Sequence, residues 1–283
     1  MIEQLLKMAF EEDLGDAGDI TSDAIFTDKR ADRYSLVAKQ DGVLCGADIF
    51  VQAFNYIDKA CKVKFYFSDG DTLKKGQQVA IIEGSINSLL KAERVALNFI
   101  SHLSGIATQV RKWTDAISKT GMNSITNKRT KILDTRKTVP GWRSLQKYAV
   151  KCGGGTNHRM GLYDMVMIKD NHIDSAGGIT KAVEMVRSKW KDRFKIEVET
   201  RTLKEVEEAL SIGVDVIMLD NMDIPTMIEA VAMVDGKAAT EASGNMTFDR
   251  IEAVAQTGVD YISVGALTHS VSVFDFSLRK TNS

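Results

Sequence analysis

The sequence has little excess charge of either sign, because 37 Lys and Arg residues nearly balance 38 Asp and Glu residues. A chain with a formal net charge of -1 has no global field that favours nucleic acid or an anionic membrane. Any site for an anion must therefore come from local clustering of Lys and Arg. No apolar run approaches the length of a membrane span.

Cysteine is also scarce. Cys45, Cys61 and Cys152 are odd in number, widely spaced and without a C-x-x-C pair, which suggests neither a disulfide framework nor a zinc site. The opening stretch MIEQLLKMAFEEDLG is acidic and amphipathic. It lacks the basic and apolar regions of a signal peptide, so none is expected. These absences together favour a protein of the reducing cytoplasm.

What is present suffices for one large core or two smaller ones, since 44% of the 283 residues are hydrophobic. Residues 1–13 predict an amphipathic helix, and strand-like runs follow in SLVAK, GVLCG, KVKFYF and QQVAIIEG. Turn signals containing glycine separate these runs. The first part of the chain therefore predicts a small domain of helices and strands.

A long helix is predicted over roughly 88–119, because apolar side chains recur there in steps of four and three. The apolar stripe consists of Ala92, Ala96, Phe99, Leu103, Ile106, Val110, Trp113 and Ile117. Arg94 lies about 200° from Ala92 at 3.6 residues per turn. We therefore expect Arg94 to point away from the buried face.

From about residue 130, apolar strands alternate with amphipathic helices. The strand-like segments are KILDT, MVMIKD, KIEVET, DVIMLD, KAATEAS and YISVGA. This alternation predicts parallel strands covered by helices, and six or seven such units favour a complete or incomplete (β/α) barrel over a doubly wound sheet. We expect a first domain over 1–110, a barrel domain over 111–269, and a tail over 270–283 that packs on the first domain.

Cationic side chains follow the early strands of this predicted barrel. The active site of a parallel α/β barrel lies at the carboxyl ends of its strands. Arg136 and Lys137 follow KIL, Lys169 follows MVMI, and the glycine-rich loop between these strands carries His158 and Arg159. Such a cluster suits an anionic substrate, through charge-assisted and often bidentate contacts.

The middle and late strands end differently. Glu199 and Asp220 follow the middle strands, where acids suit a divalent metal or a developing positive charge. The late strands end in small turns, each followed by a helix-like segment, whose backbone N–H groups suit a phosphate monoester. The residues of these turns are Ser243, Gly244, Asn245, Gly265 and Ala266.

Each feature also has a purely structural interpretation. The cations could be solvated loop charges, and Lys169 could be a strand-end lysine that reaches water. His158 could be a satisfied loop histidine, and the two acids could cap the following helices. The glycine turns could be plain turns. Their joint occurrence at adjacent strand ends favours a functional site.

A family resemblance adds to this interpretation. In order, LDTRKTVPGWR, KCGGGTNHRMGLYDMVMIKDNHI, IEVET, VIMLDN, EASGN and GVDYISVGALTHS resemble motifs of quinolinate phosphoribosyltransferases, as do EEDLGDAGDITS and AERVALNFISHLSGIAT. The resemblance runs nearly end to end. It implies an N-terminal α/β sandwich domain, an open seven-stranded (β/α) barrel, and a homodimer in which the sandwich of one subunit covers the other's barrel.

The resemblance also implies residue roles. Quinolinate would be bound by Arg136, His158 and Arg159, with Arg94 supplied by the partner chain. Lys137 and Lys169 would line the substrate and pyrophosphate region. Glu199 and Asp220 match acids near the ribose and its magnesium, and which of them holds the metal stays open. The 5′-phosphate would be held by Ser243, Gly244, Asn245, Gly265 and Ala266.

The implied reaction is phosphoribosyl transfer from phosphoribosyl pyrophosphate to quinolinate with decarboxylation. It gives nicotinate mononucleotide, pyrophosphate and carbon dioxide, a step of NAD biosynthesis. The supply of cations suits the two carboxylates of quinolinate better than the single carboxylate of nicotinate. Three alternatives remain: a related transferase acting on another base, an aldolase in which Lys169 forms a Schiff base, and a non-catalytic phosphate sensor.

The chain departs from the family pattern at three positions. Asn245 stands where a second glycine is usual, and asparagine tolerates a positive φ better than most other residues. Val139 and Trp142 replace the more usual Thr and Leu. We expect these two to adjust the wall of the pocket without removing activity.

Overall fold

The computed structural model describes residues 2–28, 30–119 and 129–281. The chain divides into two compact units. Unit 1 comprises Met1–Arg111, Pro140–Gly154 and Val271–Ser283, and unit 2 comprises Lys112–Val139 and Gly155–Ser270. Residues 140–154, which the sequence analysis assigned to the barrel domain, thus belong to unit 1.

Unit 1 is built on an antiparallel four-stranded sheet of order β12-β1-β5-β3. Its strands are β12 (Phe276–Lys280), β1 (Ala31–Ala38), β5 (Gln78–Ser85) and β3 (Lys62–Phe65). The tail therefore joins the first strand, with Leu36 opposite Leu278. Two short strands, β2 (Gly42–Val43) and β4 (Thr72–Leu73), form a separate pair. The sheet explains why runs far apart in the sequence share one core.

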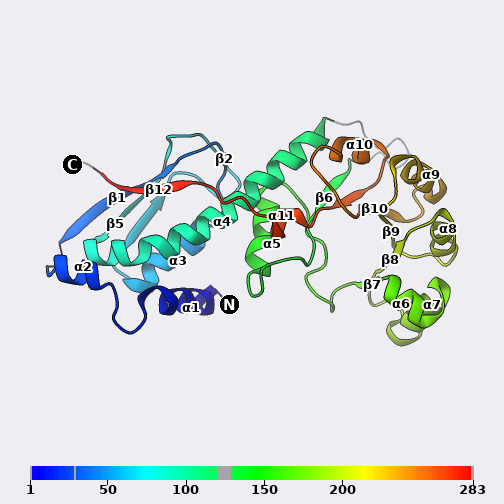
Figure 1. Ribbon diagram of the computed structural model, residues 1–283, viewed down its shortest axis with the longest axis horizontal. Coiled ribbons are helices and arrows are strands. Elements are labelled where there is room, and N and C mark those ends of the chain that lie inside the picture. The colour runs from blue at the N-terminus through cyan, green and yellow to red at the C-terminus, as the bar shows by residue number, and fades with distance from the viewer. Residues whose placement is uncertain (1, 29, 120–128, 282–283) are drawn as a thin grey trace. The chain divides into compact units, whose positions relative to one another are not determined.

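Helices complete unit 1 (Figure 1). They are α1 (Ile2–Leu14), α2 (Ile20–Ile25), α3 (Ala47–Ile57), α5 (Arg143–Cys152) and the part of α4 (Ile86–Ser118) up to Arg111. Every member of the predicted apolar stripe on α4 is buried, and Arg94 is exposed as expected. Helix α3 was not predicted from the sequence, although Phe50 and Phe54 are fully buried on it.

Unit 2 contains a parallel six-stranded sheet of order β6-β11-β10-β9-β8-β7. The strands are β6 (Lys131–Leu133), β7 (Val166–Ile168), β8 (Ile196–Thr200), β9 (Val216–Asp220), β10 (Ala239–Ser243) and β11 (Tyr261–Ser263). From β7 to β11 consecutive strands are neighbours, and β11, the last strand, pairs with β6, the first, whereas β6 and β7 end the sheet. A further parallel bridge joins Leu133 to Thr156 on the opposite side of β6.

Helices alternate with these strands, and all but the last of them lie along one side of the strands in Figure 1. They are α6 (Asp170–Ala176), α7 (Ile179–Trp190), α8 (Leu203–Ser211), α9 (Ile224–Val234), α10 (Ile251–Gln256) and α11 (Ala266–His269). All six predicted strands are present. The mixed architecture of a small sheet domain and a parallel, helix-covered sheet is confirmed, with six strands in the described residues where seven were expected.

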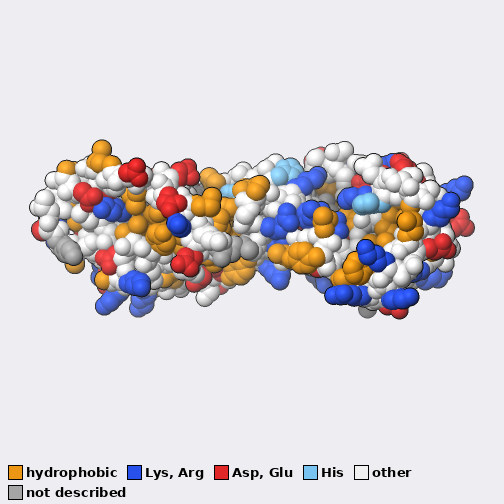
Figure 2. Space-filling model, turned by 90° about the horizontal axis from the view of Figure 1, so that it is seen from below, with side chains coloured by type: hydrophobic (Ala, Val, Ile, Leu, Met, Phe, Trp, Pro, Cys, Tyr) orange, Lys and Arg blue, Asp and Glu red, His pale blue; other side chains and the backbone are white. Residues whose placement is uncertain are grey.

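Within the described ranges, no helix is long and apolar enough to span a membrane. The surface carries both signs of charge, as the near-neutral composition requires. Figure 2 shows one face, on which Lys and Arg side chains gather over unit 2, at the right, around a hollow. Cationic clustering is therefore local.

Candidate active site

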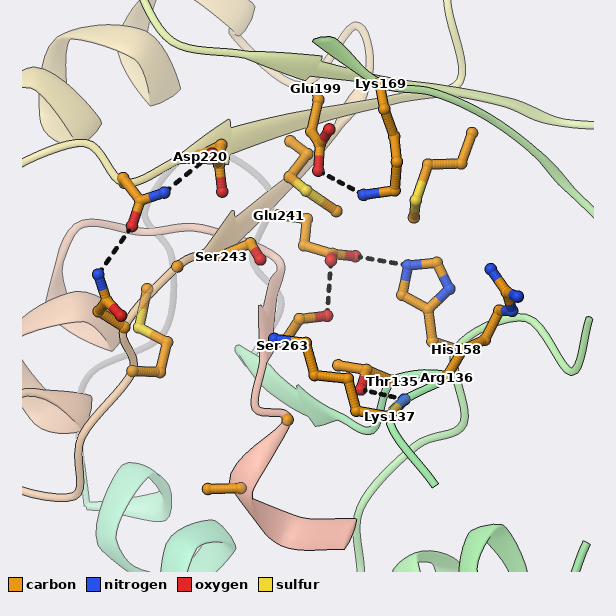
Figure 3. A pocket seen from close by; sticks show the side chains of 18 of the residues that line it. Thr135, Arg136, Lys137, His158, Lys169, Glu199, Asp220, Glu241, Ser243 and Ser263 are labelled. Atoms are coloured by element: carbon orange, nitrogen blue, oxygen red, sulfur yellow. Dashed lines mark hydrogen bonds and ion pairs between the residues drawn. The ribbon is translucent and has the colours of Figure 1, made fainter. Parts of the chain in front are cut away.

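A cavity of about 830 Å³ lies in unit 2 where the strands end, the position expected for a barrel site. Every site residue predicted within the barrel lines it (Figure 3). They are Arg136, Lys137, His158, Arg159, Lys169, Glu199, Asp220, Ser243, Gly244, Asn245, Gly265 and Ala266. Arg94 is not among the lining residues and belongs to α4 in unit 1.

The loop that carries His158 is fixed by Asp134, the residue that follows β6. Asp134 is fully buried. Its carboxylate accepts hydrogen bonds from the Asn157 side chain at 2.5 Å and from the backbone N–H of His158 at 2.9 Å. Hydrogen bonds to a buried carboxylate are strong, so they hold the loop in place. Asp134 therefore positions the loop instead of facing substrate.

His158 lies on a buried floor that the sequence analysis missed. Its Nε2 is 3.2 Å from Oε2 of Glu197 and 3.4 Å from Oε2 of Glu241. The Ser263 hydroxyl donates to the other oxygen of Glu241 at 2.6 Å. The three ionisable side chains are 6%, 0% and 2% exposed, respectively. We call His158, Glu197, Glu241 and Ser263 the floor.

The charges of the floor are strongly coupled. Burial alone would lower the pKa of His158, but the carboxylates of Glu197 and Glu241 outweigh it and raise the pKa to about 10. Burial, with the charge of Glu241, raises the pKa of Glu197 to about 7, although His158 opposes this. The Nδ1 atom of His158 accepts the backbone N–H of Arg159 at 2.7 Å, which opposes a proton there. Nε2 therefore carries a proton in either form of the ring.

Arg159 lies beside the floor and faces a second cation. Its Nη1 donates to the backbone carbonyl of Met165 at 3.0 Å, and its Nη2 lies 3.6 Å from the sulfur of Met167. Burial lowers its pKa, and the positive charge of Arg136 lowers it further. A bound anion would relieve the repulsion between these two guanidinium groups.

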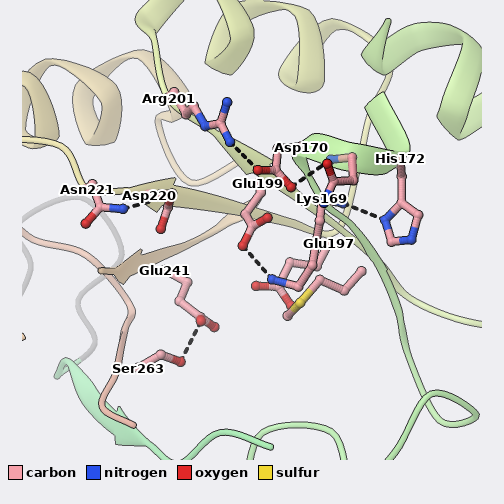
Figure 4. A network of polar contacts seen from close by, with 12 residues as sticks. Lys169, Asp170, His172, Glu197, Glu199, Arg201, Asp220, Asn221, Glu241 and Ser263 are labelled. Carbon is pink, nitrogen blue, oxygen red and sulfur yellow. Dashed lines mark hydrogen bonds and ion pairs between the residues drawn. The ribbon is translucent and has the colours of Figure 1, made fainter. Parts of the chain in front are cut away.

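Lys169 and Glu199 form an ion pair at the top of the pocket in Figure 3, with Nζ and Oε1 2.6 Å apart. Figure 4 shows a further pair, Arg201 with Asp170, beside it. The backbone N–H of Lys169 donates to Nδ1 of His172 at 3.0 Å. An ammonium group held by a carboxylate is not the free amine that a Schiff base requires, so this geometry disfavours the aldolase alternative.

Asp220 ends β9 and accepts a hydrogen bond from the Asn221 side chain at 2.9 Å. The Asn221 side chain in turn accepts from Asn245 at 3.3 Å. Both asparagines have positive φ, 55° and 46°. The conditional prediction that Asn245 would serve at a positive φ is thus met. We call Arg136, Lys137, Lys169 and Asp220 the rim.

The late strands end in tight turns. Gly244 has φ +92°, and an added Cβ would collide with the side chain of Asn221. Gly265 immediately precedes the short helix α11, as expected. The turn after Ser243 does not lead directly into a helix, because α10 begins only at Ile251. A helix thus follows this turn as expected, but an irregular segment separates the two.

The two other departures from the family pattern do not line the cavity. Trp142 stacks on Phe99 in unit 1, with ring centroids 4.6 Å apart. Val139 is 42% exposed. The expectation that these residues adjust the pocket wall is therefore wrong.

The missed residues share one signal. Glu197 and Glu241 are acids at interior positions of β8 and β10, and such acids are almost never fully buried unless paired. The pocket also takes Thr135, Met167, Met218, Asn221, Met246, Thr247, Ser263 and His269, none of which was predicted. Thr135 and Asn221 lie at strand ends but are uncharged, so they were not selected there. Met167, Met218 and Ser263 lie within strands, Met246 and Thr247 lie in an irregular segment, and His269 ends α11, so strand ends do not identify them.

Known proteins resemble the chain over nearly its full length. A probable nicotinate-nucleotide pyrophosphorylase (carboxylating) of Bacillus subtilis is 42% identical over 99% of this chain and 93% of its own length. Quinolinate phosphoribosyltransferase (decarboxylating) 2b, mitochondrial, of Nicotiana tabacum is 42% identical over 98% of this chain and 82% of its own. The crystal structure of NadC from Streptococcus pyogenes superposes with a TM-score of 0.91 at 40% identity, covering 99% of this chain and 97% of the other.

The parallel, helix-covered sheet of unit 2 and the cationic cavity at its strand ends define a protein of the α/β class. Two family models match it: the N-terminal domain of quinolinate phosphoribosyl transferase over residues 19–104 and the C-terminal domain over residues 106–279. The chain belongs to the quinolinate phosphoribosyltransferase family.

Proposed function

We propose that this protein is a pentosyltransferase that moves the phosphoribosyl group from phosphoribosyl pyrophosphate to quinolinate with decarboxylation. The products are nicotinate mononucleotide, pyrophosphate and carbon dioxide, and the reaction serves NAD biosynthesis. The observation that carries this proposal is the gathering, in one cavity, of paired arginines, lysines, acids and glycine turns. The family relationship supports it.

Substrate binding follows from the charges. Arg136 and Arg159 repel one another in the free protein, and the two carboxylates of quinolinate would relieve that repulsion. His158 would add a third donor or cation, held in place by Glu197 and Glu241. An unpaired buried carboxylate costs several kcal/mol, so two substrate carboxylates require several cations, whereas nicotinate requires fewer.

The transfer step separates charge along the cavity. The pyridine nitrogen attacks the anomeric carbon as the bond to pyrophosphate breaks, and positive charge develops on the ribose. Glu199 or Asp220 would stabilise that charge, while Lys137 and Lys169 would stabilise the departing pyrophosphate. Ser243, Gly244, Asn245, Gly265 and Ala266 would hold the 5′-phosphate through backbone N–H groups.

The acids fit a magnesium ion shared with the substrate. Glu199 and Asp220 line the pocket on neighbouring strands and offer the oxygen ligands that magnesium prefers. Magnesium commonly takes one or two carboxylates and completes its shell with substrate phosphates and water. Bound there, the ion would neutralise charge on the pyrophosphate.

Decarboxylation follows once the ring nitrogen is quaternary. The carbon–carboxylate bond beside that nitrogen breaks, and the electron pair left on the ring carbon is stabilised by the adjacent positive charge. A proton then replaces carbon dioxide. Catalysis favours groups that bind the transition state better than the ground state, so the cations should hold the carboxylate that stays more firmly than the one that leaves.

The test is a turnover assay on purified protein with quinolinate, phosphoribosyl pyrophosphate and magnesium. We expect nicotinate mononucleotide and carbon dioxide in equal amounts, and loss of both when the metal is chelated. Product from nicotinate but not from quinolinate would support a related transferase for another base. No product from any pyridine carboxylate, nicotinamide included, would contradict the proposal, and borohydride trapping at Lys169 would then test the aldolase alternative.

We also propose a homodimer in which Arg94 completes the partner's pocket. Its support is the exposure of Arg94 on a helix whose apolar stripe is fully buried, together with its absence from the pocket lining of its own chain. A mixture of the variants Arg94→Ala and Arg136→Ala tests this. Random reassociation of two inactive dimers would restore about a quarter of the wild-type activity, because half the dimers would hold one intact site. No recovery would contradict the shared site.

A cytoplasmic location is part of the same proposal. It rests on the sparse and widely spaced cysteines of the sequence. Fractionation of cells that express the full-length protein would test it, and recovery in an organelle or a secreted fraction would contradict it.

A further inference from the structure

Two cysteines that are far apart in the sequence meet inside unit 1. Cys45 directly precedes Gly46, the N-cap of α3, and Cys152 is the last residue of α5. Their sulfur atoms and a carboxylate oxygen of Asp69 all lie within 4.8 Å of one another. The third cysteine, Cys61, is not part of this cluster. The sequence spacing gave no hint of this pairing.

Residues of one helix, α4, hydrogen-bond to the backbone at or next to both cysteines. The backbone N–H of Cys45 donates to the hydroxyl of Ser104 at 2.9 Å, and that hydroxyl donates back to the carbonyl of Cys45 at 3.0 Å. Arg111 donates to the carbonyl of Gly153, next to Cys152, at 3.2 Å. The two sulfur atoms are thus brought together by anchored backbone.

Asp69 is already engaged in the structure. Its carboxylate accepts the backbone N–H groups of Gly46 and Ala47, which begin α3, and the hydroxyl of Tyr148 at 3.0 Å. A metal ion would have to compete with these bonds, and zinc normally takes four ligands. The geometry therefore favours chemistry between the two sulfurs over metal binding.

The two thiols differ in the way that disulfide exchange requires. Cys45 is fully buried, whereas Cys152 is half-buried. A hydrogen bond from the thiol of Cys45 lowers the pKa of Cys152 against the effect of burial, and the Tyr148 hydroxyl adds to this. The same hydrogen bond and burial raise the pKa of Cys45. A more accessible thiolate beside a protonated thiol is an attacking and resolving pair.

We infer that Cys45 and Cys152 form a redox-active dithiol that is oxidised to a disulfide by small-molecule disulfides. The thiolate of Cys152 attacks one sulfur of the small disulfide and releases one thiolate. Cys45 then attacks Cys152 in this mixed disulfide, loses its proton and releases the second thiol. In total the dithiol gives up two protons and two electrons, and the small disulfide takes them up to become two thiols.

The Cys45–Cys152 disulfide would also restrain the backbone that leads from α5 into a loop of the pocket. Cys152 ends the helix that precedes the loop carrying His158 and Arg159. Oxidation should therefore change the KM for quinolinate more than kcat. This last step rests on the proposed function, whereas formation of the disulfide does not.

The experiment treats the full-length protein with glutathione disulfide, blocks free thiols with N-ethylmaleimide, and maps peptides by mass spectrometry without reduction. We expect a Cys45–Cys152 linked peptide and an alkylated Cys61 after denaturation. In Cys45→Ala, Cys152 should instead accumulate as the glutathione adduct. Accumulation of that adduct in the wild type, or an unmodified Cys152, would overturn the inference.

Thermal unfolding gives a second, independent readout. A cross-link that closes a long loop removes entropy from the unfolded chain, so oxidation should raise the Tm by several degrees in the wild type and in Cys61→Ala. Cys152→Ser should show no such rise. If zinc under reducing conditions instead binds one ion per chain and blocks alkylation of Cys45 and Cys152, the site is a metal site and the dithiol assignment is wrong.

Discussion

The rim and the floor of the pocket in unit 2 carry charge in different ways. On the rim, Lys169 is 41% exposed and pairs with a neighbouring acid. On the floor, Glu197 and Glu241 are almost completely buried around His158. Exposed charges are screened and individually weak, whereas buried ones are costly unless they are matched. From this comparison we expect the rim to bind the substrate anions and the floor to hold His158 in position.

The largest expected effect is at the cations that would face quinolinate. Arg136→Ala or Arg159→Ala should lower kcat/KM by about 100-fold or more, mainly through KM for quinolinate, because a substrate carboxylate loses its partner. Steady-state kinetics with each substrate varied in turn would measure this. The control is Arg193→Ala, an exposed arginine over Phe194 outside the cavity. Near-normal kinetics in both pocket variants would remove the basis for this assignment.

A smaller loss of kcat/KM, about tenfold to 100-fold, is expected from Glu241→Gln on the floor. The pKa of His158 is raised from 6.5 to about 10, so its stabilising contribution is present below pH 6.5 and is lost as pH rises through about 10. Glu241→Gln removes one of the carboxylates that raise the pKa of His158, so this stabilising contribution should be lost at a lower pH. Unfolding midpoints between pH 6 and pH 10 would show this, and superimposable profiles would contradict the role of the floor.

Next in size is the phosphate turn. Gly244→Ala adds a Cβ at φ +92° against the side chain of Asn221, and we expect about a tenfold loss of affinity for phosphoribosyl pyrophosphate. Gly213→Ala is the matched control, because Gly213 also has a positive φ, +67°, but no heavy atom within 4 Å of the added Cβ. Calorimetric titration would compare them, and equal affinities would show that backbone strain alone accounts for the change.

The smallest effect is expected at Asn245, where the chain departs from the family pattern. Asn245→Gly relieves a φ of 46° but removes the 3.3 Å contact with Asn221 and adds freedom to the unfolded chain. These effects oppose one another, so stability should change by about 0.5 kcal/mol or less. Denaturant unfolding and turnover would check this, and a large loss of activity would show that the Asn245 side chain itself acts in the site.

The rim could be predicted because active sites of parallel α/β barrels lie at the carboxyl ends of their strands. Apolar runs ending in Arg136, Lys169, Glu199 and Asp220 identify strands, and their carboxyl ends meet at one edge. The ten residues predicted in this way line one cavity, together with His158 and Arg159 of the glycine-rich loop. Helix α4 could be predicted for a similar reason, since its stripe repeats with the helical period over many turns.

The floor and the boundaries of the units could not be predicted in this way. Glu197 and Glu241 follow no strand-end rule, and their pairing with His158 depends on strands that are adjacent only in the folded sheet. Residues 140–154, which include α5, belong to unit 1 although they lie between two barrel strands in the sequence. The assignment of this segment to unit 1 depends on its packing against α4, and local sequence patterns contain no information about such packing.

The sequence by itself determined which segments become strands and helices, because hydrophobic period is a local property of the chain. It also determined which charges follow the strands, and with them the family and the class of ligand. Tertiary structure alone decided the contacts between distant positions. It buries two acids around His158, and it brings Cys45 to Cys152 from the beginning of α3 and the end of α5. Such contacts depend on how the elements pack, and packing is a property of the whole fold.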